Sequence, residues 1–315
     1  MASALALARR GLGQTWPNPT VGCVLVKDGT ALVRGRTGRG GRPHGEAVAL
    51  AAAQAAGVDV RGATAYVSLE PCAHHGRTPP CAEALVAADI ARCVIATGDP
   101  DPRVAGRGIA ILRAAGIAVT EGVGRDDADE ISAGFFCRVR LGRPLVTLKL
   151  ATSLDGRIAT AAGDSKWITG APARARGHML RAEHDGILVG IGTALADDPE
   201  LTCRLPGLDD RSPVRVVADS GARLPVDSAL VRAAKTVPLW LMCAEDAPAE
   251  NIEAHEARGV AVHRLPRGAD GHIEPAALLQ ALGGQGMTRL LVEGGGTLAA
   301  ALLAADLVDR LAIFR

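Results

Sequence analysis

The sequence has few aromatic residues: three Trp, three Phe and one Tyr, or 2% of 315 positions. Hydrophobic residues nevertheless make up 48% of the chain, so a packed core must be built from Ala, Val, Leu and Ile. A chain of this length is typical of about two domains. The composition therefore indicates globular domains with aliphatic cores.

An excess of charge of either sign is also missing. The chain has 35 basic and 34 acidic residues, which gives a formal net charge of +1. Binding to nucleic acids or to membrane surfaces usually depends on an excess of basic residues. We therefore expect no nucleic-acid partner and no membrane partner, and the balance favours a small-molecule substrate.

Long apolar runs are absent, so we expect no segment that spans a bilayer. The first residues, MASALALARRGLG, place their basic residues after the apolar part, which is the reverse of a secretory signal. The seven cysteines are odd in number and scattered, which is a poor pattern for a disulfide framework and fits a reducing compartment. We expect a cytoplasmic protein, and we expect it to form a homo-oligomer.

Residues with catalytic chemistry concentrate between positions 44 and 81. The stretch contains HGE at 44–46, EPC at 70–72 and PPC at 79–81. One imidazole and two thiols suit a catalytic zinc site, in which three protein ligands leave the fourth tetrahedral position for water. We predict His44, Cys72 and Cys81 as the zinc ligands. Glu46 is then the general acid/base that moves protons between the water and the leaving group.

The predicted elements place these residues at the ends of helices and strands. A helix is expected from residue 44 to 57, and a strand at 63–69 leads to Cys72. Pro80 suits the first turn of a second helix, which puts Cys81 near its amino end, where the dipole favours a thiolate. Residues two apart on a helix point in nearly opposite directions. His44 and Glu46 can therefore reach one site only if their helix presents its amino end to it.

Three residues near the predicted ligands leave alternatives open. His74 and His75 could compete as zinc ligands, or they could line the entrance or face solvent. Arg77 could hold a substrate phosphate or be a solvated loop arginine. A single His or Cys is often structural, so the zinc prediction depends on the combination of ligands and their placement.

The ligand pattern is that of the zinc deaminases, H-x-E followed by P-C-x-x-C, except that eight residues separate Cys72 from Cys81. With that insert the string EPCAHHGRTPPC resembles the bifunctional deaminase/reductase family of riboflavin biosynthesis. PNPTVGC at 17–23 resembles the amino-terminal motif of that family and contains Asn18, a candidate substrate contact. Gly45 departs from the family, which usually has Ala there. We expect Gly45 to loosen the first helical turn without abolishing catalysis.

Two glycine runs follow apolar strands in the second half. Residues 187–190 lead into GIGT at 190–193, and residues 290–293 lead into GGGT at 294–297. A strand that enters a glycine run and then a helix is typical of phosphate binding, because free N–H groups and the helix dipole face the anion. Neither run is the G-x-G-x-x-G of a Rossmann fold, so each could instead be only a turn.

Motifs along the second half are similar, in order, to the reductase half of the same family: LKLATSLDGRIA, DSKWITG, VGIGTALADDPELTCR, VVADS and VEGGGTLAAALL. The resemblance thus covers nearly the whole chain, and it implies a dihydrofolate-reductase-like fold that uses NADPH. The nucleotide contacts that it implies are Ala151, Trp167, Thr193, Asp197, Ser220, Gly295, Gly296 and Thr297. The substrate contacts that it implies are Ser165, Arg181, Leu201, Arg204 and Glu293. The two arginines suit a substrate phosphate, although each charged residue could instead be a solvated surface group.

The expected fold is an α/β protein of two domains. A cytidine-deaminase-like α/β sandwich is predicted for residues 1–143, and a dihydrofolate-reductase-like α/β domain for 144–315. Residues 121–143 are predicted to be a polar, glycine-punctuated connection. The chain ends inside a predicted strand at 310–314 where the family continues, so we expect the last strands of the reductase sheet to be missing.

The resemblance implies a two-step enzyme for a pyrimidine ribosyl phosphate. Zinc-dependent hydrolytic deamination of a diaminohydroxyphosphoribosylaminopyrimidine would precede NADPH-dependent reduction of its ribosyl group to ribityl. One alternative is a deaminase of nucleosides or tRNA with an unrelated second domain, which retention of RNA would favour. Another is a structural zinc module with a nucleotide-sensing domain, which a fourth protein ligand from His74 or His75 would favour.

Overall fold

The structure is a computed structural model, and it describes residues 1–75, 79–161 and 168–315. The chain forms two compact units, Met1–Leu141 and Gly142–Arg315, each with its own sheet.

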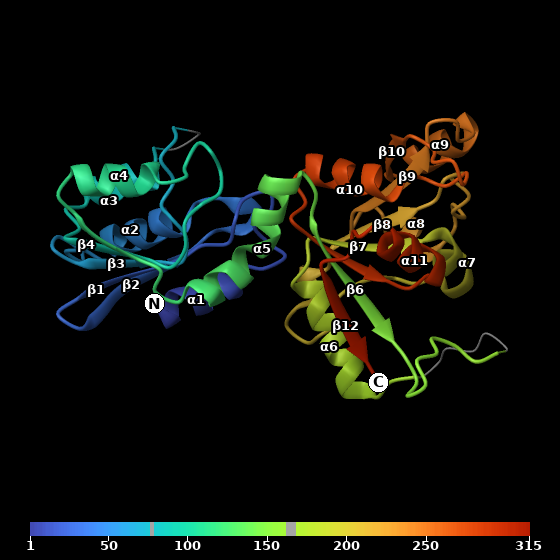
Figure 1. The fold of residues 1–315 in the computed structure, drawn as a ribbon, viewed down its shortest axis with the longest axis horizontal. Coiled ribbons are helices and arrows are strands. Elements are labelled where there is room, and N and C mark those ends of the chain that lie inside the picture. The colour runs from blue at the N-terminus through green and yellow to red at the C-terminus, as the bar shows by residue number, and fades with distance from the viewer. Residues whose placement is uncertain (76–78, 162–167) are drawn as a thin grey trace. The chain divides into compact units, whose positions relative to one another are not determined.

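The first unit, coloured from blue to green in Figure 1, contains a five-stranded sheet in the order β2-β1-β3-β4-β5. β1 runs antiparallel to β2 and β3, whereas β3, β4 and β5 are parallel. The strands are β1 (Gly22–Lys27), β2 (Thr30–Arg36), β3 (Thr64–Val67), β4 (Arg92–Ile95) and β5 (Ala118–Glu121). The helices are α1 (Ala2–Arg9), α2 (Gly45–Ala55), α3 (Cys81–Ala87), α4 (Arg107–Ala114) and α5 (Arg125–Leu141).

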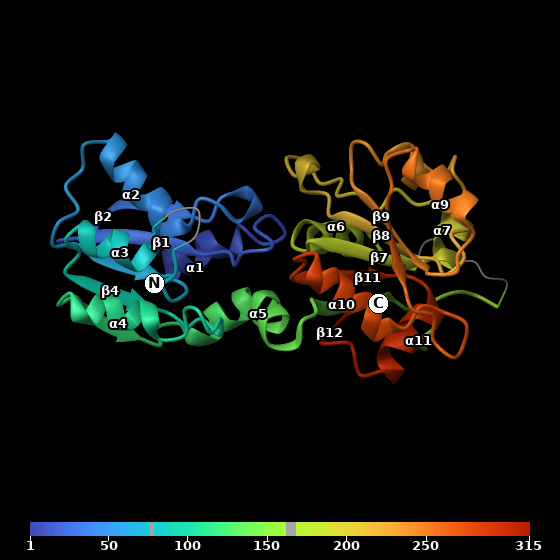
Figure 2. The same cartoon turned by 90° about the horizontal axis from the view of Figure 1, so that it is seen from above.

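Helices cover both faces of this sheet, as Figures 1 and 2 show. α1 packs on β1 and against α5, whereas α2 packs on β1 and β2 from the other face and is followed by α3 and α4. Alternate residues of β1, such as Cys23 and Leu25, are fully buried and form one core with Leu85 and Leu112 of α3 and α4. The predicted α/β sandwich is therefore present.

The expected connection at 121–143 is instead largely the helix α5, Arg125–Leu141. Acidic residues lie in its first turn and basic residues in its last, the favourable arrangement for the helix dipole. The side chains of Ile131 and Phe136 on this helix are buried in the first unit. Gly134 costs about 1 kcal/mol of helix propensity, and burial of this apolar face outweighs that cost. The polar, glycine-containing sequence had therefore suggested the wrong structure.

The second unit contains a seven-stranded sheet in the order β10-β9-β8-β7-β11-β6-β12. All pairings between these strands are parallel. The strands are β6 (Leu145–Ala151), β7 (Gly186–Gly190), β8 (Val214–Ala218), β9 (Leu239–Ala244), β10 (Ala261–Leu265), β11 (Arg289–Glu293) and β12 (Arg310–Phe314). The helices are α6 (Ala171–Ala182), α7 (Ile191–Asp197), α8 (Ala229–Arg232), α9 (Ala249–Glu256), α10 (Pro275–Gly284) and α11 (Gly296–Ala304).

Burial on both faces explains the continuous apolar strands of this unit. A parallel sheet needs helices over both faces, so its central strands read as unbroken apolar runs. In β7 and β11 nearly every residue is buried. β7, β11 and β6 are neighbours, so their carboxyl ends meet at one edge, where α7 and α11 begin. Ligands of open parallel sheets bind at such an edge.

The cores of both units are aliphatic, as the composition predicts. Among the described residues, Phe136 is the only aromatic side chain in the buried set. Within the same ranges, no helix combines the length and the apolar character that crossing a membrane requires.

Candidate functional site

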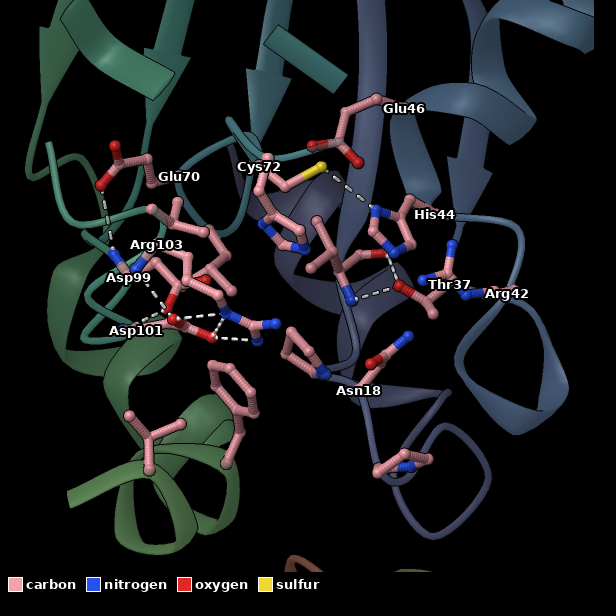
Figure 3. Close-up of a pocket in the computed structure, with 18 of the residues that line it drawn as sticks. Asn18, Thr37, Arg42, His44, Glu46, Glu70, Cys72, Asp99, Asp101 and Arg103 are labelled. Carbon is pink, nitrogen blue, oxygen red and sulfur yellow. Dashed lines mark hydrogen bonds and ion pairs between the residues drawn. The ribbon is translucent and has the colours of Figure 1, made fainter. Parts of the chain in front are cut away.

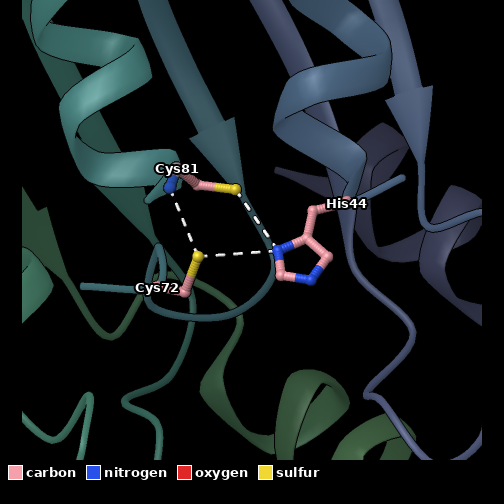
Figure 4. A group of neighbouring side chains, drawn as sticks. All are labelled: His44, Cys72 and Cys81. Carbon is pink, nitrogen blue, oxygen red and sulfur yellow. Dashed lines mark hydrogen bonds between the residues drawn. The ribbon is translucent and has the colours of Figure 1, made fainter. Parts of the chain in front are cut away.

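A polar site lies in the first unit where the amino ends of α2 and α3 meet the segment after β3. His44 directly precedes α2 in extended conformation, with φ −71° and ψ 157°, and its carbonyl accepts the N–H of Val48 at 3.0 Å. Its side chain therefore projects from the amino end of the helix toward the site (Figure 4). Glu46, in the first turn, approaches the same site, so the helix end brings the two side chains together.

The two cysteines are held by backbone hydrogen bonds. Cys81 is the first residue of α3 and follows Pro80, whose ψ of 143° lies outside the helical range. The N–H of Cys81 donates to Cys72 Sγ at 3.2 Å, and the N–H of Ala82 donates to the Cys72 carbonyl at 3.2 Å. Cys72 is thus fixed at the amino end of α3, where the helix dipole favours a thiolate.

The donor atoms of these residues have the spacing of a tetrahedral zinc site. His44 Nδ1 lies 3.5 Å from Cys72 Sγ and 3.4 Å from Cys81 Sγ (Figure 4). Zinc bonds of about 2.3 Å to sulfur and 2.0–2.1 Å to nitrogen, at a tetrahedral angle, separate the two atoms by about 3.5 Å. In the described part of the chain, no fourth His, Cys, Asp or Glu joins this group. The residues fit zinc with one position open.

The two thiols differ in acidity. The hydrogen bond with Cys81 lowers the pKa of Cys72 to about 4, and the same bond raises the pKa of Cys81. The hydrogen bond with Cys72 also raises the pKa of the His44 imidazole. The cluster therefore carries a thiolate at Cys72 and retains a proton that a metal ion would displace.

Glu46 is a buried carboxyl group beside the sulfur atoms. It is 3% exposed, and burial raises its pKa to about 7. Figure 3 shows its carboxylate next to Cys72 and His44. A group with a pKa near neutrality can both take up and return a proton during a reaction.

The pocket in front of this cluster has two polar walls (Figure 3). Asn18, Thr37 and Arg42 form the wall on the side of α2, and the Asn18 amide nitrogen donates to the Gly41 carbonyl at 2.9 Å. Phe135 of α5 also lines the pocket. The helix that replaces the expected connection thus contributes to the site.

The opposite wall is the loop after β4. Asp99 Oδ1 accepts the N–H of Asp101 at 2.8 Å, and the Arg103 guanidinium pairs with both oxygens of Asp101. Burial raises the pKa of Asp99 to about 6, whereas the hydrogen bonds from Arg103 lower the pKa of Asp101. This wall offers the pocket a carboxyl group that can be protonated and a fixed ion pair.

The two histidines of the insert lie outside the ligand group. His74 lines the pocket, whereas the exposed His75 forms an ion pair with Glu83, with Nε2 and Oε2 3.4 Å apart. Arg77 lies outside the described residues.

The second unit has a cavity at the carboxyl ends of β6, β7 and β11. Its lining contains most of the expected nucleotide contacts: Ala151, Thr193, Asp197, Gly295, Gly296 and Thr297. Gly294 and Gly295 have φ values of 83° and 84°, and a Cβ on either would lie 3.1–3.3 Å from Thr193. Both the positive φ values and the nearness of Thr193 therefore favour glycine at these two positions.

Two expected nucleotide contacts are not among the described residues that line this cavity. Ser220 follows β8 and does not belong to the described lining of this cavity; its hydroxyl accepts the N–H of Ile273 at 3.0 Å. Trp167 lies outside the described residues, as does Ser165, an expected substrate contact.

Arg181 and Glu293 form a largely buried ion pair beside the cavity at the carboxyl ends of β6, β7 and β11. Arg181 Nε and Nη2 donate to the two carboxylate oxygens of Glu293 at 2.8 and 2.9 Å. Lys149 Nζ lies 3.8 Å from the same carboxylate. Burial raises the pKa of Glu293, but the hydrogen bonds from Arg181 outweigh it, so the pKa is below its ordinary value. Glu293 is therefore ionised at neutral pH.

The segment after α7 is held against this pair. Arg181 Nη1 donates to the Thr202 carbonyl at 2.9 Å, and the N–H of Arg204 donates to His178 Nδ1 at 3.3 Å. Leu201 is buried with a φ of 55°, a left-handed conformation that a non-glycine residue adopts at a cost. The expected substrate residues Arg181, Leu201, Arg204 and Glu293 thus share one neighbourhood.

Comparison with known families covers both units. The RibD C-terminal domain matches residues 144–315, more than half of the chain, and the cytidine and deoxycytidylate deaminase zinc-binding region matches residues 1–97. The riboflavin biosynthesis protein RibD of Escherichia coli is 44% identical over all of this chain and 86% of its own length. The RibD protein of Aquifex aeolicus is 38% identical over all of this chain and 85% of its own.

The chain belongs to the RibD family.

Solved RibD structures have the same fold. A Thermotoga maritima diaminohydroxyphosphoribosylaminopyrimidine deaminase/5-amino-6-(5-phosphoribosylamino)uracil reductase superimposes with a TM-score of 0.85 at 37% identity, covering 99% of this chain and 84% of that one. Acinetobacter baumannii RibD gives 0.85 at 41% identity, covering 98% and 83%. The predicted deaminase-like and reductase domains are confirmed.

As a RibD-family member, the chain is a bifunctional enzyme of riboflavin biosynthesis, with a zinc-dependent deaminase domain and an NADPH-dependent reductase domain. The match over the second unit excludes an unrelated appended domain. The family match and the open ligand group also argue against a purely structural zinc module.

Several residues of the two RibD-family sites escaped the sequence analysis: Thr37, Arg42, Asp99, Asp101, Arg103, Phe135 and Arg138 in the first unit, and Lys149 and His178 in the second. The acidic loop had a detectable sequence pattern, since DPDP at 99–102 follows a buried strand at the carboxyl edge of a parallel sheet. The others lie on elements whose relation to the site depends on packing.

Proposed function

We propose that the first unit deaminates a diaminohydroxyphosphoribosylaminopyrimidine and that the second unit reduces the ribosyl group of a 5-amino-6-(5-phosphoribosylamino)uracil to ribityl. These are the substrates in the name of the T. maritima relative. The observation that carries the proposal is the convergence of His44 Nδ1 and the sulfur atoms of Cys72 and Cys81 beside the buried Glu46.

Each residue of the first site has a role in this hydrolysis. His44, Cys72 and Cys81 hold zinc, which when bound supplies a Lewis acid that brings the pKa of water near neutrality. Glu46 takes a proton from the attacking water and delivers it to the departing amine. Water adds to the amine-bearing ring carbon, so the C–O bond forms first and the C–N bond then breaks, with one water consumed and one ammonia released. The Glu46 pKa of about 7 suits both transfers.

Substrate contacts in the first unit are proposed at Asn18 and Arg77. The position of Asn18 in the pocket wall supports its role. Its amide nitrogen already donates to Gly41, so its oxygen is the atom proposed to accept from the substrate. Arg77, which lies outside the described residues, is proposed as a phosphate contact because a guanidinium group can bind phosphate oxygens bidentately.

The second site is proposed to bind NADPH through the cavity-lining residues Ala151, Thr193, Asp197, Gly295, Gly296 and Thr297, with Trp167 and Ser220. NADPH, when bound, supplies the hydride. Arg181 is engaged through three nitrogen atoms with Glu293 and Thr202, so it is proposed to orient the carboxylate. The more exposed Arg204 is proposed as the phosphate contact, with Leu201, Glu293 and Ser165 completing the substrate site.

The deaminase assignment is tested by ammonia release from the diaminopyrimidine ribosyl phosphate, measured before zinc removal, after it and after zinc is restored. We expect release to vanish with the metal and to return with it. Glu46→Ala should lower the rate by about 10²–10⁴ with zinc content unchanged. Glu83→Gln, which changes a half-buried carboxyl group of the same unit, is the matched control and should keep full activity.

Full activity in Glu46→Ala would contradict the assignment of the general acid/base. Lack of ammonia release from folded, zinc-loaded protein would contradict the proposed substrate.

Three further predictions remain proposals. A functional boundary near residue 143 is supported by the division of the chain into units that meet at 141/142. Assembly into a homo-oligomer remains a prediction from the sequence, and light scattering would test it. A cytoplasmic location is supported by the seven scattered cysteines, none of which forms a disulfide.

A further inference from the structure

Glu70 is a buried carboxylate that the deamination mechanism does not use. It follows β3, two residues before the zinc ligand Cys72, and it is 4% exposed. Its backbone N–H donates to the Thr97 carbonyl at 2.9 Å, which continues the pairing of β3 with β4. Figure 3 shows its side chain turned away from His44 and Cys72, toward Asp99.

Both oxygens of Glu70 are occupied by backbone donors. Oε2 accepts the N–H groups of Asp99 at 3.3 Å and Gly106 at 3.1 Å. Oε1 accepts the N–H groups of Gly108 at 3.1 Å and Ile109 at 3.3 Å. A carboxylate with four such bonds has no lone pair directed at a substrate, so Glu70 is not a proton donor or acceptor in the reaction.

These bonds join three parts of the unit. Gly106 precedes α4 with a φ of 79° and has no side chain to cap the helix, so Glu70 supplies the cap for the N–H groups of Gly108 and Ile109. The approach is close, because a Cβ on Gly108 would lie 2.0 Å from the Pro71 carbonyl oxygen. Glu70 thus clamps α4 to the segment that carries Cys72.

The clamp also fixes both ends of the acidic pocket wall. The Asp99 and Gly106 bonds enclose the loop 99–106, which carries Asp101 and Arg103. Cys72 lies two residues from Glu70 in the chain. The Glu70 carboxylate therefore connects this loop to the segment that carries a predicted metal ligand.

We propose that Glu70 is a positioning residue for deamination: through its four backbone hydrogen bonds it holds the 99–106 wall at the distance from the zinc ligands that the substrate requires. The inference rests on the deamination proposed above. It assigns to Glu70 a role in substrate binding through Asp99 and its neighbours, not in the transfer of protons.

Glu70→Gln is a sharp test because it keeps the shape of the side chain. Each carboxylate oxygen accepts two N–H groups, so either orientation of the amide directs an NH₂ group at two backbone donors. Two of the four hydrogen bonds are then lost, because the amide NH₂ group and two backbone N–H groups face each other. A buried donor without an acceptor costs free energy. With the NH₂ group at the Oε2 position, the loop loses its bonds at both Asp99 and Gly106. With the NH₂ group at the Oε1 position, α4, which follows the loop directly, loses its bonds at Gly108 and Ile109.

The measurement is steady-state ammonia release, with zinc content and NADPH oxidation measured on the same preparations. We expect Glu70→Gln to raise the KM for the diaminopyrimidine substrate about tenfold with a smaller change in kcat, while zinc content and reduction are unchanged. Glu121→Gln is the control, since it removes the negative charge from an exposed 2.8 Å contact between Glu121 and Arg113 at the other end of α4. It should leave KM unchanged.

A double-mutant cycle with Asp99→Asn tests whether Glu70 acts through the loop. If it does, Glu70→Gln should raise KM by a smaller factor in the Asp99→Asn background than in the wild type. Equal factors in both backgrounds would overturn the inference. Activity that falls only in proportion to lost zinc, with KM unchanged, would also overturn it and give Glu70 a purely structural role.

Amide hydrogen exchange on the wild-type protein keeps the proposal testable should Glu70→Gln not fold. The amides of Asp99, Gly106, Gly108 and Ile109 should be protected without substrate to the degree of β4 amides. Rapid exchange there would overturn the inference. Absence of ammonia release from the wild type would instead refute the proposed function, so the two failures are distinguishable.

Discussion

Replacing Gly45 by Ala sets helix propensity against a tertiary contact. Gly45 is the first residue of α2 and separates His44 from Glu46. From the sequence, Ala should tighten the first turn and stabilise the helix. In the structure, a Cβ at this position would lie 2.6 Å from the Val21 carbonyl oxygen and 3.2 Å from its carbon.

The clash with Val21 costs more free energy than the higher helix propensity of Ala gains. Ala gains at most about 1 kcal/mol over Gly in a helix interior, and less in the first turn. The Val21 carbonyl cannot turn away freely, because it accepts the N–H of Thr37 at 2.8 Å. Overpacking of this kind costs about 1–3 kcal/mol. We therefore expect Gly45→Ala to destabilise the first unit by about 1–2 kcal/mol, a factor of about 5–30 in the ratio of folded to unfolded protein.

Zinc release into a chromogenic chelator along a urea series measures this effect in the first unit alone, because the proposed ligands all lie there. The urea midpoint should fall for Gly45→Ala. Gly177→Ala is the matched control: Gly177 lies within α6, and a Cβ there would meet nothing within 4 Å. Gly177→Ala should raise the thermal unfolding midpoint of the second unit, because Ala has the higher helix propensity and its Cβ would clash with nothing there.

An unchanged or higher urea midpoint for Gly45→Ala would refute the reasoning. It would show that β1 moves away from α2 at negligible cost, and that helix propensity decides the sign at this position.

Two further predictions concern the second unit. Glu293→Gln should impair NADPH oxidation, leave ammonia release intact and destabilise the unit by about 3–5 kcal/mol, because Arg181 loses its buried counter-charge; equal loss of both activities would contradict separate sites. His184 is buried, one ring nitrogen lies 2.6 Å from the Leu180 carbonyl, and burial lowers its pKa to about 3. Since its unfolded pKa is about 6.5, its contribution is present above pH 6.5 and is lost as the pH falls toward 3, by about 2 kcal/mol at pH 5. His184→Gln should flatten the pH dependence of the unfolding midpoint of this unit. The same pH dependence in the wild type and the variant would contradict a lowered pKa of His184.

Residue identity and spacing were sufficient to predict an α/β protein and to single out His44, Cys72 and Cys81, which the structure brings together. A His, two Cys and a Glu at helix starts and a strand end have few chemical uses, so the pattern points to one kind of site. The strands of the second unit were detectable for a similar reason, because burial on both faces leaves unbroken apolar runs such as 187–189 and 290–292. The glycine run at 294–296 likewise indicated a ligand-binding edge.

Tertiary structure alone decided which distant groups share a contact. The polar stretch at 125–141 is helical because its apolar face is buried. Gly45 is a weak helix former, but it fits its position because the Val21 carbonyl leaves no space for a Cβ. Glu70 finds its donors in the 99–109 segment, and Arg181 finds its carboxylate 112 residues away. Local propensity carries no information on such pairs, because the free energy of a buried hydrogen bond depends on the partner that packing brings to it.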